Sequence, residues 1–201
     1  DFLCLSKGLT GGYLPMSAVL TREDVYGAFY DEYAKLRAFL HSHSYSGNAL
    51  ACTAALATLG IFESDGVIER NRALAGHLGK RACELLGELP HVAELRQCGM
   101  IVAAELAQDG DRHRPFDWRD RRGLRVYRHG LEHEALLRPL GNVVYFMPPY
   151  VITPDEVDAL VTTARDAIVV ATADCPATTR RAGSAGRTGV TPAASSAGLE
   201  F

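Results

Sequence analysis

The feature that most limits the fold is a short apolar run that stops at a lysine and a group of glycines. Residues 2–5 (FLCL) have the length and the apolar character of a buried strand. Lys7 follows, and Gly8, Gly11 and Gly12 come soon after it, which is typical of a tight loop. A second apolar run, residues 16–20, indicates a returning strand. The sequence therefore predicts strand, loop and strand, with Lys7 at the first junction.

A lysine at this junction suits covalent chemistry. Glycine allows the backbone to approach a ligand closely, so the space above Lys7 would stay open. Its amine could form a Schiff base with a flat aldehyde cofactor such as pyridoxal phosphate, and partial desolvation would favour the nucleophilic form. The commoner alternative is a lysine that ends a strand and extends into water. Position alone leaves both open.

The polar segment 41–48 (HSHSYSGN) precedes a helix predicted over residues 49–62, with Asn48 as its N-cap. Free backbone N–H groups and the positive end of a helix favour phosphate, and Ser44 would add a hydroxyl donor. An ordinary capped loop is an equally good interpretation. His41 and His43 have no cysteine or carboxylate partner at a familiar spacing, so we expect no metal.

Arg138 follows a short apolar strand predicted at residues 135–137. Its planar guanidinium suits the carboxylate of an acid substrate, although a surface ion pair is the commoner role of an isolated arginine. The segment 145–150 (YFMPPY) begins at Tyr145 and predicts a rigid wall, lining a pocket or closing a core.

The remaining periodicity predicts an α/β chain with two units and a tail. Further helices are predicted over residues 24–40, 67–86, 119–133 and from Pro154, and further strands over residues 92–95, 100–106 and 142–147. Residues 1–65 would form part of an α/β layer and residues 66–173 a smaller α+β module. Residues 174–201 are rich in Ala, Gly, Ser and Thr and should be disordered.

Composition excludes several classes of function. The net charge of the 201 residues is −3, and no basic face indicates nucleic acid. No apolar stretch approaches the length that spans a membrane. The five cysteines are scattered, as in reduced cytoplasmic proteins. Because the chain opens without Met and enters a strand at once, we expect it to be the C-terminal piece of a longer protein.

Three stretches carry a family resemblance: 1–21 (DFLCLSKGLTGGYLPMSAVLT), 39–54 (FLHSHSYSGNALACTA) and 137–154 (LRPLGNVVYFMPPYVITP). They resemble the C-terminal part of class III aminotransferases, which are pyridoxal-phosphate enzymes of fold-type I. The resemblance extends over about residues 1–173. It implies the C-terminal part of a large cofactor-binding domain, followed by a small α+β domain.

The resemblance also implies roles for six residues. Lys7 would bond to the cofactor. Ser44 and the backbone at His43 would contact the cofactor phosphate across a homodimer interface, where many members have Gly-Pro-Thr at positions 42–44. Ser42 would lie beside the substrate, Arg138 would bind a substrate carboxylate, and Tyr145 would lie near the substrate channel.

The third stretch is most similar to those family members that act in biotin synthesis. The implied activity transfers an amino group from S-adenosylmethionine to 8-amino-7-oxononanoate. Alternatives are a class III aminotransferase for ornithine, 4-aminobutyrate or another ω-amine, and a non-catalytic fragment. The aspartate that pairs with the cofactor ring in this family belongs to the N-terminal half, outside this resemblance.

Overall fold

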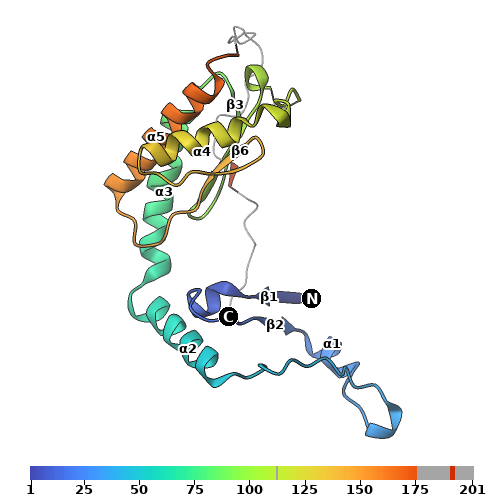
Figure 1. Cartoon of the computed structure of the whole chain (residues 1–201). Coiled ribbons are helices and arrows are strands. Elements are labelled where there is room, and N and C mark those ends of the chain that lie inside the picture. The colour runs from blue at the N-terminus through green and yellow to red at the C-terminus, as the bar shows by residue number, and fades with distance from the viewer. Residues whose placement is uncertain (112, 176–190, 193–201) are drawn as a thin grey trace. The chain divides into compact units, whose positions relative to one another are not determined.

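The computed structural model describes residues 1–111, 113–175 and 191–192. The chain divides into two compact units, residues 1–67 and 68–201 (Figure 1). The boundary predicted from sequence, between residues 65 and 66, lies close to this division.

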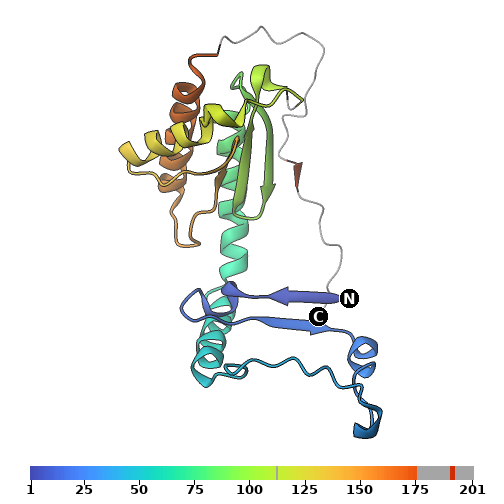
Figure 2. The same cartoon turned by 45° about the vertical axis from the view of Figure 1, so that its right-hand side comes forward.

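Unit 1 begins with the predicted strand, loop and strand, but the first strand, predicted to be buried, is largely exposed within the chain. β1 (Phe2–Leu5) pairs antiparallel with β2 (Ala18–Thr21), from Phe2 opposite Thr21 to Leu5 opposite Ala18 (Figure 2). The connection starts with a 3-10 turn, η1 (Lys7–Thr10). Gly11 and Gly12 follow with φ of 60° and 83°, a left-handed conformation that glycine adopts without steric cost. The glycines therefore turn the chain directly after the lysine.

The helix that closes unit 1 is α2 (Ala49–Ser64), close to the predicted range. Its N-cap is Asn48, whose side-chain oxygen accepts a hydrogen bond of 3.0 Å from the Ala51 N–H. α2 packs against η1, and Ala51 and Ala55 are its buried residues. Apolar residues cover its other sides as well, so most of its apolar surface is exposed within the chain.

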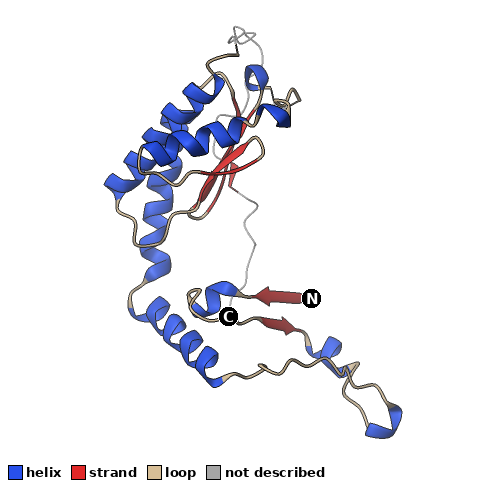
Figure 3. Cartoon of the chain, viewed as in Figure 1, coloured by secondary structure: helices blue, strands red, loops and turns tan. Residues whose placement is uncertain are grey.

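The prediction of a helix over residues 24–40 is wrong. Only α1 (Glu23–Gly27) and the 3-10 turn η2 (Tyr33–Lys35) form, and loop connects η2 to α2 (Figure 3). A helix owes most of its stability in a protein to the packing of an apolar face. Here Phe29 and Tyr30 are exposed, and their rings contact Phe39 and Tyr26 at centroid distances of 5.4 Å. The helical pattern of the sequence alone therefore overpredicted the helix.

Unit 2 is built on a sheet with the strand order β5-β6-β4-β3-β7. Neighbours pair antiparallel, except for β7, which pairs parallel to β3. The strands are β3 (Val92–Cys98), β4 (Ile101–Leu106), β5 (Arg138–Leu140), β6 (Val143–Phe146) and β7 (Thr191–Pro192). β7 falls within the tail predicted to be disordered, and residues 176–190 and 193–201 of that tail lie outside the described residues.

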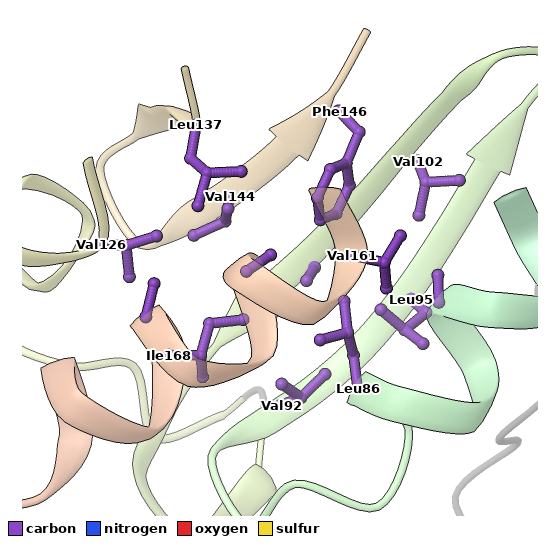
Figure 4. Packing of buried hydrophobic residues seen from close by; sticks show 14 of the residues in the cluster. Leu86, Val92, Leu95, Val102, Val126, Leu137, Val144, Phe146, Val161 and Ile168 are labelled. Atoms are coloured by element: carbon purple, nitrogen blue, oxygen red, sulfur yellow. The ribbon is translucent and has the colours of Figure 1, made fainter. Parts of the chain in front are cut away.

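Three helices cover one face of this sheet: α3 (Val67–Leu86), α4 (Arg122–Glu132) and α5 (Pro154–Thr172). α5 begins with the predicted capping box, in which Thr153 and Glu156 satisfy each other's backbone N–H groups. The core lies between helices and sheet, and Figure 4 shows part of it. Leu78 of α3, Val126 of α4 and Val161 of α5 are fully buried there.

The strand predicted at residues 135–137 is also misplaced, because β5 starts at Arg138. Ala135 and Leu137 are buried, as their apolar character indicated, but they lie in the turn after α4. The Ala135 N–H donates to the Gly130 carbonyl at 2.8 Å, and the Leu137 N–H donates to the Ala135 carbonyl at 3.0 Å. The short apolar run thus anchors a turn, and Arg138 is the first strand residue.

The end of α5 is tied to α4 by charge. Arg125 Nη1 donates to Asp174 at 2.9 Å, and the buried Arg122 side chain donates to the same carboxylate and, at 2.8 Å, to the Ala171 carbonyl. These two arginines lower the pKa of Asp174 from 3.8 to about 2. The two arginines of α4 therefore fix the chain beyond the last turn of α5, as far as Asp174.

Candidate functional site

Lys7 lies at the edge of a pocket in unit 1. It is the first residue of η1, and its side chain is exposed. The pocket has a volume of about 800 Å³ and is also lined by His43, Ser46, Asn48 and Tyr13. Within the described residues no hydrogen bond or ion pair involves the Lys7 amine. The amine is therefore free to meet a ligand, although the partial desolvation expected for it is not found.

The polar loop before α2 folds into turns that end at its N-cap. The His43 carbonyl accepts a hydrogen bond of 2.9 Å from the Ser46 N–H, and His43 Nδ1 accepts one of 3.2 Å from the Tyr45 N–H. The Asn48 N–H in turn donates to the Tyr45 carbonyl at 3.1 Å. These bonds hold the loop at the start of the helix, where backbone N–H groups and the helix dipole favour an anion.

The structure brings some of the predicted residues together in this pocket. Lys7 and His43 both line it. Ser42 and Ser44 lie on the same loop and are exposed, but neither is among the lining residues. Sequence reasoning missed Tyr13 and Ser46, which line the pocket. Their places within the glycine loop and the polar loop were the signal that could have found them.

The donor set suits an aldehyde that carries a phosphate. A primary amine with no partner among the described residues can bond to a carbonyl carbon. A loop of serines ahead of a helix N-terminus supplies hydroxyl and N–H donors for a phosphate. Pyridoxal phosphate has both groups, so the residues present fit it. No group of three or more His, Cys, Asp or Glu side chains within the described ranges could hold a metal ion.

A second pocket, of about 760 Å³, lies in unit 2 and contains the other predicted residues. Arg138 and Tyr145 both line it, with apolar walls from Leu136, Met147 and Pro148. The Arg138 guanidinium carbon lies 5.8 Å from the centre of the Tyr145 ring. Glu134 and Glu156 also line this pocket, and neither lies within ion-pair distance of Arg138. A cation beside apolar walls is suited to a ligand that has a carboxylate and an apolar chain.

The acidic groups of this pocket are occupied or lie apart from Arg138. Glu156 lines the pocket, but its carboxylate accepts hydrogen bonds from the Thr153 N–H at 2.7 Å and from the Thr153 hydroxyl at 2.9 Å. Both bonds lower the pKa of Glu156 and keep its carboxylate ionised, and the bond from the Thr153 backbone N–H has the larger effect. No described carboxylate lies within ion-pair distance of Arg138.

Comparison with known proteins identifies the family. Residues 1–168 match the family model described as "Aminotransferase class-III". A protein of Helicobacter pylori named adenosylmethionine-8-amino-7-oxononanoate aminotransferase is 49% identical over 160 residues, which cover 78% of this chain and 35% of the relative. The solved structure of the protein of that name from Methanocaldococcus jannaschii has a TM-score of 0.79 at 41% identity, covering 84% of this chain and 38% of that one.

A third comparison concerns the cofactor. An amine transaminase from an uncultivated Pseudomonas species, solved in a PLP-bound form, has a TM-score of 0.75 at 30% identity, covering 88% of this chain and 39% of that one. The chain belongs to the class III aminotransferases, which are pyridoxal-phosphate-dependent transferases of fold-type I.

Two further facts bear on the whole protein. The chain spans about 35% of the length of the Helicobacter pylori relative. In the part of the chain that the structure describes, no single helix is long and apolar enough to cross a membrane, and only α2 and α3 taken together, as a bent pair, meet that test.

Proposed function

We propose that this chain carries part of an aminotransferase that moves an amino group from S-adenosylmethionine to 8-amino-7-oxononanoate and yields 7,8-diaminononanoate in biotin biosynthesis. The observation that carries the proposal is the pocket of unit 1, which Lys7 shares with the loop before α2. The identity of 49% to a relative named for this reaction supports the choice of substrates.

The proposed role of Lys7 is to bond to pyridoxal phosphate and to move protons. When bound, this cofactor supplies the electron sink that lets the carbon beside a substrate amine lose a proton. Lys7 Nζ has no competing partner among the described residues, so it is available both as nucleophile and as base. In the proposed reaction it holds the proton that leaves the amine-bearing carbon of the donor.

Ser44 and the backbone at His43 are proposed to bind the cofactor phosphate, and Ser42 to lie beside the substrate. Support comes from the hydrogen-bonded turn at 43–46 and from the N-terminus of α2, which follows it. In the family this loop serves the partner subunit. Ser42 and Ser44 stand outside the lining of the Lys7 pocket, in keeping with a role toward a second chain.

Arg138 is proposed to bind the carboxylate of 8-amino-7-oxononanoate, with Tyr145 near the substrate channel. An unpaired guanidinium among apolar walls favours an acid with a long carbon chain. An Arg138→Ala variant of the complete enzyme should raise the KM for the oxononanoate far more than the KM for S-adenosylmethionine. Equal effects on both would favour a class III enzyme for ornithine, 4-aminobutyrate or another ω-amine.

A homodimer is the proposed assembly. α2 is apolar on all sides, yet Leu50, Leu56 and Leu59 are 73%, 70% and 53% exposed within the chain. A helix that is apolar all round is normally buried, so these residues call for cover from another polypeptide surface. We propose neither a nucleic-acid nor a membrane partner, and the five free cysteines support a cytoplasmic location.

The decisive experiment asks whether Lys7 bonds to the cofactor. The chain is incubated with pyridoxal phosphate and reduced with borohydride, and its peptides are then weighed by mass spectrometry. The proposal expects a pyridoxyl group on Lys7 and none on Lys35, whose amine is held by Asp31 at 2.8 Å. Equal labelling of the two lysines would contradict a specific site.

A non-catalytic role for the isolated chain is the second candidate, and the exposure of Lys7 favours it. In that case the small domain and the apolar surfaces persist without a working cofactor site. The same experiment separates the two candidates. If Lys7 is labelled in the complete enzyme but not in this chain, cofactor binding depends on residues outside these 201, and the isolated chain is non-catalytic.

A further inference from the structure

Arg138 and Tyr145 lie directly opposite each other on neighbouring strands. The pairing of β5 with β6 places Arg138 against Tyr145, and the pairing of β6 with β4 places Tyr145 against Ala103. Residues directly opposite in an antiparallel pair point to the same face, with Cβ atoms about 4.5–5.5 Å apart. The Tyr145 ring is thus the side chain that the sheet itself places beside the Arg138 guanidinium.

A second arginine in the same row shows what is special about Arg138. Ala103 is paired in turn with Arg96 on β3, and Arg96 with Thr191 on β7, so the row across the sheet contains two arginines. Arg96 is neutralised, since its Nη1 lies 2.6 Å from Glu94 and 2.5 Å from Glu105. Arg138 has no such carboxylate among the described residues. Its guanidinium carbon lies instead 5.8 Å from the centroid of the Tyr145 ring.

The row lies on the side of the sheet away from the core. Leu95, Ala104 and Val144 form the adjacent row and are buried against the helices. Strand residues alternate between faces, so Arg138 and Tyr145 belong to the face opposite the one that α3, α4 and α5 cover. A long flexible side chain on such a face would sample many rotamers unless something held it.

We propose that Tyr145 is a positioning residue, whose ring holds the Arg138 guanidinium in the orientation that receives a ligand carboxylate. This inference rests on the proposed binding of a carboxylate by Arg138. The face of an aromatic ring attracts a cation, and a planar guanidinium can lie against it while its N–H edge stays open. The ring therefore leaves free the edge that a carboxylate would bind in bidentate fashion.

The ring is required and the hydroxyl is not, so Tyr145→Phe should behave like the natural chain. Tyr145→Leu keeps an apolar side chain but removes the ring. Because exposed cation–π contacts contribute about 0.5–1 kcal/mol, the loss should weaken carboxylate binding about two- to fivefold.

The test uses the 201-residue chain and nonanoate, an acid with one carboxylate and an apolar chain. NMR titration gives the Kd, and before any ligand is added the spectrum also gives the chemical shift of the Arg138 δ-methylene protons, which the ring current of Tyr145 should move upfield. Tyr145→Leu should abolish that upfield shift and raise the Kd about two- to fivefold. Tyr145→Phe should preserve both values. Tyr127→Leu, which removes a half-buried tyrosine ring on α4, should leave both unchanged.

The outcomes separate this inference from the proposed function. If Arg138→Met binds nonanoate as well as the natural chain does, Arg138 is not the carboxylate group and the proposed role of Arg138 fails. If Arg138→Met loses binding but Tyr145→Leu matches Tyr145→Phe in both readouts, Arg138 keeps its role and the positioning by Tyr145 is wrong. If Tyr145→Phe is as weak as Tyr145→Leu, the hydroxyl matters, which also overturns the proposal.

Discussion

A glycine on α4 allows the helix to lie directly against the strand that carries Arg138. Gly123 is buried near the start of α4, and α4 packs on β5. A Cβ placed on Gly123 would overlap the carbonyl oxygen of Gly141 and lie 2.6 Å from the Pro139 Cβ. A backbone carbonyl and a proline ring have little freedom to move away. We therefore expect Gly123→Ala to push β5, and Arg138 with it, out of place.

The free energy of unfolding should fall as a result of two opposing effects. Alanine in place of glycine favours a helix by at most about 1 kcal/mol. Overpacking a well-filled core costs about 1–3 kcal/mol, and the rigid neighbours of Gly123 argue for the upper end of that range. The difference leaves Gly123→Ala less stable by about 2 kcal/mol.

The matched control is Gly76→Ala on α3, where an added Cβ would meet nothing within 4 Å. It should gain up to about 1 kcal/mol, because only the helix preference changes. Urea unfolding followed through the methyl NMR signals of Val126 and Val144, both fully buried in unit 2, measures each value. If Gly123→Ala is as stable as Gly76→Ala, the close packing of α4 on β5 is not what the residue serves.

Three further predictions concern the framework of unit 2. Thr153→Ala breaks the capping box of α5 and should lower the free energy of unfolding by about 0.5–2 kcal/mol in urea, while an equal loss on removing any exposed threonine would argue against a specific cap. Leu78→Ala opens a cavity at a fully buried position and should lower the free energy of unfolding by about 2–5 kcal/mol in the same measurement. Ile68→Ala truncates a half-exposed side chain on the same helix and should have a far smaller effect. The ionised Asp174 is favoured by its two arginines, so its stabilising effect should be complete above its ordinary pKa of 3.8 and fade as pH falls through about 2. A carbon-13 NMR titration should give that low midpoint, and a midpoint near 3.8 would mean that the contact with α4 does not form in solution.

The sequence predicted the elements whose signals are local. The capping box of α5 and the Asn48 cap of α2 depend on residues close together in the chain, and both form as expected. The strand, loop and strand around Lys7 could also be predicted, because an apolar run that ends in glycines limits the backbone to few conformations. Local chemistry of this kind needs no knowledge of the rest of the fold.

Elements that depend on distant partners could not be predicted in the same way. The helix expected over residues 24–40 had the right residues for an apolar stripe, but unit 1 offers that stripe no surface to pack on. The run at residues 135–137 was predicted to be a strand, yet the bond from the Ala135 N–H to the Gly130 carbonyl makes it a turn. The neighbour of Arg138 was equally hidden, since only the register of β5 on β6 places Tyr145 beside it.

The unequal burial of the two units decides how the candidate sites can be tested. Unit 2 has a continuous core from α3, α4, α5 and the sheet, so the structure around Arg138 is supported within the chain itself. In unit 1 few residues are buried, and Lys7 stays exposed beside an apolar helix that lacks cover. A folded domain needs enough buried apolar surface to offset the entropy of its chain, and unit 1 shows little of it. Carboxylate binding at Arg138 should therefore persist in this chain even under conditions in which Lys7 fails to hold a cofactor.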